Sequence, residues 1–160
     1  MNPFYRVDNR LVHGQIIATW MPHLRLQRIL IVSDTVPNNA LQMTMFRMAI
    51  PQNIQFEALP IKSAARSLAA RAYGNDRVLV LLETVTDAVR LFQGGNPFAL
   101  LNIGNVHHAA DRKRFTNAVY LSETELEQLR GLMDRGTRIE IRSLPTEPPI
   151  DLRHAMSEAR

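Results

Sequence analysis

The residues best suited to chemistry lie near the amino terminus, where His13 follows Arg10 by three positions and is followed directly by Gly14. Neutral imidazole is a competent nucleophile near pH 7, and a phosphorylated imidazole nitrogen stays labile enough to pass its group onward. An arginine can grip phosphoryl oxygens through two parallel hydrogen bonds, whereas a lysine offers only a point charge. We therefore interpret His13 as a candidate nucleophile and Arg10 as a candidate phosphate-binding residue.

The first turn of a predicted helix supplies further candidates. The amides of Gly14, Gln15 and Ile16 would lack intrahelical partners, and the positive end of the helix dipole would lie at the same place. A phosphoryl group is the anion that fits such a site best. We include these three residues and Asn9 among the phosphate-binding candidates, and we expect Asp8 to help shape the turn. The plainer alternative is that the histidine only caps or packs at a turn.

Two elements must position this loop. The residues before it have the aromatic and β-branched character of a short strand, namely Phe4, Tyr5 and Val7. Those after it fit one apolar face of a helix that Pro22 is expected to end, namely Ile16, Ile17, Trp20 and Met21. The histidine would then lie between the carboxyl end of a strand and the start of a helix.

The run Arg-Val-Asp-Asn-Arg-Leu-Val-His-Gly-Gln at residues 6–15, followed by an apolar helix with Trp20, closely resembles the active-site loop of a known family. This family is the mannose/fructose/sorbose group of enzyme IIB subunits of the bacterial sugar phosphotransferase system. The similarity extends over nearly the whole chain and continues through residues 31–34, 77–82, 101–104, 118–122 and 139–146. The first loop is the specific part, while the later segments mainly support the fold.

The resemblance implies a phosphotransferase activity. His13 would accept a phosphoryl group, at Nδ1, from a phosphohistidine on the cognate IIA protein. It would then donate the group to a sugar bound by membrane-embedded IIC and IID partners. No cofactor or metal is expected. The alternative, from another class of function, is a regulatory binding protein whose affinity for a target changes when His13 is phosphorylated, with no sugar modified.

The chain departs from the family pattern at two places. Many members have a Gly-Gly-Met run after the fifth strand and then a lysine-rich loop, where this chain has Gly104-Asn-Val-His-His108 and Ala109-Ala-Asp-Arg-Lys113. Asn9 also stands where an aspartate is frequent. These departures concern the partner and the sugar more than the phosphorylation of His13.

Composition narrows the class of protein. A chain of 160 residues without cysteine predicts a single domain over 1–160 and excludes a disulfide framework or a thiolate zinc site. We expect a cytoplasmic protein, because no signal peptide or membrane-spanning apolar run is visible. The net charge of +4 is spread along the chain, with only Arg112-Lys-Arg114 clustered, which favours a solvated basic face over nucleic-acid binding.

The order of predicted elements indicates an α/β fold. Apolar or alternating runs predict strands at 28–33, 54–59, 77–82, 98–102 and 138–142. We expect the last of these at an edge of the sheet, exposed on one face. Helical patterns between them imply an open, mostly parallel sheet with helices on both faces. The segment 118–120 is expected to add one antiparallel strand, and the chain is expected to leave regular structure from Pro145 to Pro149.

Short sequence patterns predict which helical residues are buried and where two of the helices begin or end. We predict that Leu41, Met45 and Met48 fill the core. Thr84 should cap one helix, with Asp87 three residues later. Another helix should begin with a capping box of Ser122 and Glu125, reinforced by packing of Leu121 on Leu126, and should end at Gly136.

Other α/β functions lack their motifs here. No glycine-rich dinucleotide turn, phosphate loop with Gly-Lys-Ser/Thr, or nucleophile elbow is present. A phospho-aspartate receiver would need paired acids after the first strand and a late lysine. A metal site on His13, His107 and His108 is conceivable but disfavoured, because adjacent histidines seldom point at one ion. The loops at His13, 34–35, 83–84 and 104–108 should meet at the carboxyl ends of the strands.

Overall fold

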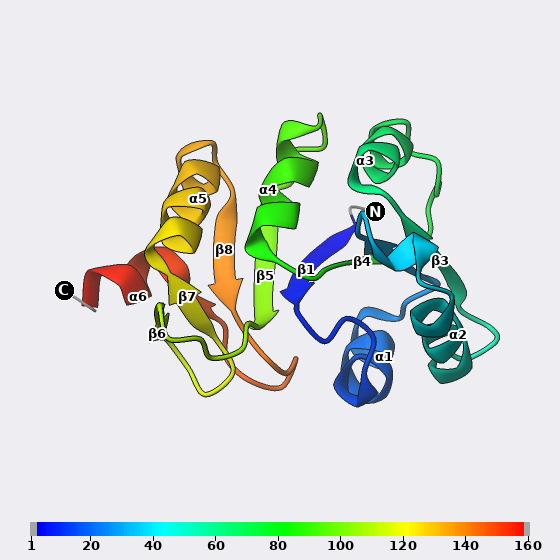
Figure 1. Cartoon of the computed structure of the whole chain (residues 1–160), viewed down its shortest axis with the longest axis horizontal. Helices are drawn as coiled ribbons and strands as arrows, with labels where there is room; N and C mark the ends of the chain where they lie inside the picture. The colour runs from blue at the N-terminus through cyan, green and yellow to red at the C-terminus, as the bar shows by residue number, and fades with distance from the viewer. Residues whose placement is uncertain (1–2, 159–160) are drawn as a thin grey trace.

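The computed structural model describes residues 3–158 and shows a seven-stranded sheet between two layers of helices (Figure 1). Its strands, in spatial order, are β3 (Gln55–Leu59), β2 (Arg28–Val32), β4 (Val78–Leu82), β1 (Phe4–Asp8), β5 (Leu100–Asn105), β8 (Arg138–Ile141) and β9 (Ile150–Asp151). All neighbours pair in parallel except β9, which is antiparallel to β8. The predicted open, mostly parallel sheet with one antiparallel strand is therefore confirmed.

The helices divide between the two faces of the sheet. One face carries η1 (Ile16–Trp20), α1 (Met21–Leu24), η2 (Val36–Asn38) and α2 (Ala40–Ala49). The other carries α3 (Ile61–Ala69), α4 (Val85–Gln93), α5 (Glu123–Asp134) and α6 (Leu152–Glu158). In Figure 1, α3, α4 and α5 run along the upper part of the view, while α1 and α2 lie at the lower right.

Side chains alternate between the two faces along each strand. Tyr5 and Val7 of β1 belong to the larger apolar core under α3, α4 and α5. Ile29 and Ile31 of β2 belong to the smaller core under α1 and α2. On the face of the sheet that carries the smaller core, apolar side chains give way to polar ones from β1 onward. These polar side chains are Arg6 of β1, Asn102 of β5 and Glu140 of β8. The functional site is built on this polar part of the sheet.

The carboxyl-terminal segment has no helix or strand from Pro145 to Pro149, as expected, and then returns to regular structure. After Pro149 the chain forms β9, in which Ile150 pairs with Ile141, and then α6, in which Leu152 is fully buried in the larger core. The expectation that β8 lies at the sheet edge, exposed on one face, is therefore wrong. A two-residue strand carries no readable periodicity, so only its pairing with β8 defines it.

The first helix also extends beyond its predicted end at Pro22. Met21 N donates to Ile16 O, five residues earlier, and the helix continues to Leu24, with Arg25 in the left-handed conformation (φ +50°) closing it. The wide π turn resets the hydrogen-bond pattern, so Pro22 lies in the first turn of α1, where its missing N–H leaves no partner unsatisfied.

The predicted core face of α2 is wrong. Leu41, Met45 and Met48 are 72%, 58% and 82% exposed, whereas Phe46 is buried. Apolar side chains occur around most of this helix, so the sequence contains two possible buried stripes. Contact with β2 and β3 selects the one with Phe46.

The segment around residue 119 does not join the main sheet as an antiparallel strand. β7 (Tyr120–Ser122) pairs instead with β6 (Arg112–Arg114) in a separate antiparallel ribbon, and Val119 makes only an isolated parallel bridge to Val106. The antiparallel strand of the main sheet is β9.

The predicted helix caps are confirmed. Ser122 and Glu125 form both hydrogen bonds of the capping box, and the Thr84 side chain accepts from Asp87 N. Gly136, just after α5, has a φ of +94°, which glycine adopts without strain. Within residues 3–158, no helix has the length and apolar character needed to cross a membrane.

Candidate functional site

The loop after β1 leaves the carboxyl edge of the sheet between β4 and β5. Leu11 N donates to Asp8 O at 2.9 Å, which closes a tight turn. Leu11 itself has a φ of +57°, an unfavourable conformation for a leucine, and is only 1% exposed. Burial of Leu11 and Val12 in the smaller core holds this turn in place and presents His13 at the start of the following helix.

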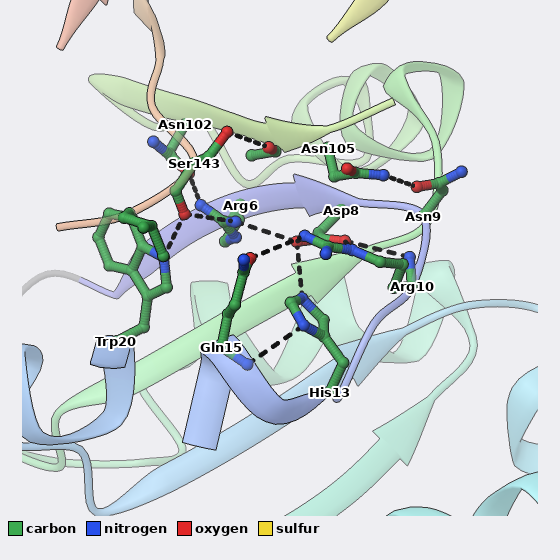
Figure 2. Close-up of polar contacts among 12 residues, drawn as sticks. Arg6, Asp8, Asn9, Arg10, His13, Gln15, Trp20, Asn102, Asn105 and Ser143 are labelled. Carbon is green, nitrogen blue, oxygen red and sulfur yellow. Dashed lines mark hydrogen bonds and ion pairs between the residues drawn. The ribbon is translucent and has the colours of Figure 1, made fainter. Parts of the chain in front are cut away.

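His13 caps that helix. Its carbonyl accepts from Ile17 N at 3.2 Å, so the amides of Gly14, Gln15 and Ile16 form the first helical turn, as the sequence predicted. The imidazole folds over the turn, and Nδ1 accepts a long hydrogen bond of 3.4 Å from Gln15 N (Figure 2). Nδ1 therefore occupies the place at the helix start where an anion would bind.

Asp8 determines which imidazole nitrogen carries the proton. Its Oδ2 lies 3.0 Å from Nε2 of His13 and, as an ionised carboxylate, can only accept a hydrogen bond. In the neutral ring the proton is therefore on Nε2, and the lone pair is on Nδ1, toward the helix start.

The electrostatics around Asp8 keep it ionised. Burial alone raises the pKa of this fully buried carboxyl, but hydrogen bonds from His13 and Arg10 and the charge of Arg6 together outweigh burial. The pKa of Asp8 consequently falls well below its ordinary value. Three cationic or polar groups thus converge on one carboxylate.

Arg10 lies at the mouth of the site. Its Nε and Nη2 contact the two oxygens of Asp8 at 3.0 and 3.1 Å, and Nη2 also donates to Gln15 Oε1 at 3.2 Å. The side chain remains 38% exposed. The predicted phosphate-binding arginine therefore lies beside His13 with part of its side chain accessible.

Arg6 is completely buried behind Asp8. It donates to Asp8 Oδ2 at 3.0 Å, to Asn102 Oδ1 at 2.6 Å, and to the carbonyls of Arg142 and Ser143 at 3.0 and 3.2 Å. The guanidinium also lies over the ring of Trp20, with its carbon 4.8 Å from the centroid, and Trp20 Nε1 donates to Ser143 O.

Gly104 makes room for this arginine. A Cβ at position 104 would lie 1.9 Å from the central carbon of the Arg6 guanidinium. Residue 104 was expected in a loop, but it belongs to β5, which continues to Asn105 because Asp8 and Asn105 still pair after an irregularity in the register. Only a residue without a side chain fits beside Arg6 here.

Asn9 is oriented away from His13. Its side chain is hydrogen-bonded to Asn105 at the end of β5 (Figure 2). It is also hydrogen-bonded to His107, beyond that strand. The end of β5 and the residues that follow it therefore adjoin the β1 loop, as expected for residues 104–108. Asp34 instead accepts from Ile61 N and pairs with Arg90, and both contacts lower its pKa. The structure connects it to α3 and α4 and not to His13.

Sequence reasoning missed four partners of the site, namely the buried Arg6, Asn102 and Glu140 and the partly buried Ser143. A signal for three of them was present, because Arg6, Asn102 and Glu140 are polar residues at alternate positions in strands that are otherwise apolar. Such residues are read as facing solvent unless their partners are known. Among residues 3–158, no group of three or more His, Cys, Asp or Glu side chains could hold a metal ion.

Comparison with known proteins gives one consistent result. Residues 3–160 match the family model described as the sorbose-subfamily IIB component of the phosphotransferase system. Relatives include the fructose-specific EIIB component of Bacillus subtilis, 27% identical over 91% of this chain and 90% of its own length. The sorbose-specific EIIB component of Lacticaseibacillus casei is 29% identical, over 92% and 90%.

A longer relative and a solved structure extend this result. The mannose-specific EIIAB component of Escherichia coli is 28% identical over 96% of this chain, which spans only 47% of that protein. The IIBSor domain of the sorbose permease from Klebsiella pneumoniae superimposes with a TM-score of 0.91 at 26% identity, covering 100% of this chain and 99% of that domain.

Proposed function

Because the chain belongs to the sorbose-subfamily IIB components of the sugar phosphotransferase system, we propose that it carries a phosphoryl group on His13. Components of this family are phosphotransferase domains. In the proposed cycle a IIA protein supplies the phosphoryl group, and a sugar bound by membrane-embedded IIC and IID partners receives it. The chain would act as one carrier domain in the cytoplasm. The name of the Escherichia coli relative, EIIAB, supports IIA as the donor.

The orientation of the His13 imidazole is the observation that carries this proposal. Nδ1 would attack the phosphorus of the donor phosphohistidine with its lone pair, while the nitrogen–phosphorus bond of the donor breaks and its electron pair returns to the donor imidazole. Asp8 retains the proton on Nε2 through its 3.0 Å hydrogen bond, so the phosphorylated ring of His13 is an imidazolium whose positive charge Asp8 balances. The donor ring keeps its own N–H proton and leaves as a neutral imidazole.

The surroundings of Nδ1 suit the transferred group. A phosphoryl group on Nδ1 would project toward the amides of Gly14, Gln15 and Ile16, which are expected to donate to its oxygens. Apart from its chain neighbours, no atom lies within 4 Å of a Cβ added at Gly14, so the start of the helix is open at this residue. Arg10 would rotate part of its guanidinium from Gln15 to the phosphoryl oxygens. Asn9 would contribute only by leaving its contacts with Asn105 and His107.

The second transfer reverses the first at the same nitrogen. A sugar hydroxyl oxygen would attack the phosphorus in line with the bond to Nδ1, and the electron pair of that bond would return to the ring. Positioning and charge stabilisation carry such a reaction, so the sugar must be held by the partner proteins.

The proposal is tested by labelling. The protein is incubated with phosphoenolpyruvate, the general phosphotransferase proteins and a IIA protein, and the label is mapped. We expect an acid-labile, base-stable phosphoprotein labelled on His13. His13→Ala should carry no label, and the matched variant His107→Ala should be labelled like the wild type. Label that persists on His13→Ala, or that maps to His107, would refute the assignment.

A further inference from the structure

A continuous line of buried hydrogen bonds crosses β8, β5 and β1 and ends at His13. We propose that Glu140 and Asn102 are positioning residues for His13, which they never touch, and that they act through Arg6 and Asp8. The inference rests on the proposed function, because it names what prepares the same histidine for phosphoryl transfer.

Strand register places these side chains in line. Arg6 pairs with Asn102, and Asn102 pairs with Glu140, so the three lie side by side on one face of adjacent strands. Glu140 Oε1 accepts from Asn102 Nδ2 at 3.0 Å, and Asn102 Oδ1 accepts from Arg6 at 2.6 Å. Arg6 and His13 then both contact Asp8 Oδ2 at 3.0 Å. The hydrogen bonds therefore run without a gap from Glu140 on β8 to the imidazole of His13.

The donors and acceptors in this line of hydrogen bonds allow only one orientation of the Asn102 amide. Carboxylates accept and a guanidinium donates, so the Asn102 amide must present Oδ1 to Arg6 and Nδ2 to Glu140. Rotating that amide by half a turn would set its NH₂ group against Arg6 and its oxygen against Glu140. Glu140 therefore fixes the amide of Asn102, which in turn fixes the guanidinium that contacts Asp8.

Charge gives Glu140 a second effect. Arg6 is buried between two carboxylates, Asp8 and Glu140; burial lowers its pKa, while the charges of both carboxylates oppose that change. Glu140 is 4% exposed, and its other oxygen lies 3.7 Å from the exposed Arg138. Removing the charge of Glu140 leaves Arg6 balanced by Asp8 alone. Asp8 would then be a weaker acceptor for His13 Nε2, and the tautomer with a lone pair on Nδ1 would be less favoured.

Glu140→Gln is the first test, because it removes the charge while keeping an oxygen for Asn102. Long-range ¹H–¹⁵N spectra of the unphosphorylated protein report the tautomer of neutral His13, whose signals are assigned by their loss in His13→Ala. We expect a smaller fraction of the Nε2–H form and phosphoryl transfer slowed by about 2- to 30-fold, the range of remote coupling in such networks. Glu127→Gln makes the same change at an exposed position on α5 and should match the wild type.

A compensating pair provides the stricter test. Asn102→Asp alone places two carboxylates in contact and should also impair transfer. In the double variant Asn102→Asp/Glu140→Gln, the new aspartate accepts from Arg6 and the new glutamine donates to that aspartate. The series of hydrogen bonds is thereby restored, and the total charge equals that of the wild type. We expect the double variant to recover the Nε2–H tautomer and a transfer rate closer to the wild type than either single variant.

The outcomes separate this inference from the proposed function. If the wild type is labelled on His13 while Glu140→Gln keeps its tautomer and rate, the positioning role is wrong and the carrier function stands. If the wild type is not labelled, the carrier function fails, and the tautomer spectra still test the line of hydrogen bonds. Thermal unfolding checks each variant. If Glu140→Gln does not fold, the positioning role is tested with the folded double variant Asn102→Asp/Glu140→Gln. Retention of the Nε2–H form in that variant supports the inference, and its loss overturns the inference.

Discussion

At the scale of single residues, Asp8 is the centre of the site, since Arg6, Arg10 and His13 all contact its carboxylate. A buried charge of this kind is stable only while its partners are present. Two consequences follow for variants of the site, one for the stability of the fold and one for the rate of transfer.

Asp8→Asn should change how stability depends on pH. The pKa of Asp8 lies below its ordinary value of 3.8 in the fold, so its ion pairs stabilise the protein fully above that ordinary pKa. The stabilisation declines as the pH drops below 3.8 and is lost once the pH falls through the lower pKa of the folded state. Urea unfolding at pH 7 and at pH 3 should show a partial loss of stability at the lower pH for the wild type and a smaller loss for Asp8→Asn. The variant should also be less stable at pH 7, by about 3–5 kcal/mol, because it leaves Arg6 buried with less compensation. Equal acid sensitivity in both proteins would contradict this explanation.

Arg10→Lys should impair transfer without affecting the fold. A lysine cannot reproduce the fork that contacts Asp8 now and is proposed to hold the phosphoryl group later. The expected cost in transition-state stabilisation is on the order of 1–3 kcal/mol, the range for hydrogen bonds to charged groups. Rapid-quench measurement of label transfer from IIA gives the rate, and the unfolding midpoint serves as the control. A wild-type rate in this variant would count against bidentate binding.

At the scale of elements, the site depends on the irregular end of β1 and on a glycine in β5. The register between the two strands changes between Val7 and Asp8, and this change brings Asn105 opposite Asp8. It leaves Gly104 directly under the buried guanidinium of Arg6. The strand pair is thus shaped around one charged side chain.

Gly104→Ala should be strongly destabilising, because a Cβ placed 1.9 Å from the Arg6 carbon must displace Arg6 or separate β1 from β5. We expect a loss of at least about 3 kcal/mol, as when a buried ion pair is broken. Gly131→Ala is the matched control: residue 131 lies within α5 with no atom near the added Cβ, and alanine there should stabilise the helix by about 0.5–1 kcal/mol. Denaturant unfolding compares the two. Similar stabilities for both variants would show that Arg6 is not confined as described.

At the scale of the whole molecule, phosphoryl carriage and sugar recognition are proposed to lie in different proteins. His13 lies at the carboxyl edge of the sheet. In the proposed cycle, a donor protein and an acceptor complex approach the same nitrogen of His13 in turn. The exposed stripe of Leu41, Met45 and Met48 lies on the helical layer that also carries α1.

The phosphorylated protein should therefore not phosphorylate free hexoses at a useful rate. Membranes that contain the cognate IIC and IID proteins should discharge it only with the right sugar, because the hydroxyl must be held in line with the labile bond. Chase of the labelled protein, with and without membranes, measures this directly. Transfer to sugar without membranes would refute the carrier model. If no sugar accepts the group even with membranes, while phosphorylation changes binding to another protein, the regulatory alternative replaces transport.

The sequence by itself determined the features that depend on neighbouring residues. The caps at Thr84 and Ser122, the apolar strands β2 and β4, and the placement of His13 at a helix start each follow from fewer than about fifteen consecutive positions, in which hydrogen bonding and periodicity are local. From these the α/β class and the candidate nucleophile could be predicted.

Only the tertiary structure decided the rest. Arg6 reads as an ordinary polar position in a strand, yet its partners Asn102 and Ser143 lie 96 and 137 residues away. Asn102 meets Arg6 because strand order and register place β5 beside β1, and Ser143 meets it from the segment that follows β8. The same dependence explains the buried stripe of α2 and the pairing of β9. Alternating polarity shows that a strand has two faces, but which face is buried, and against which partners, depends on packing between segments that are distant in the chain.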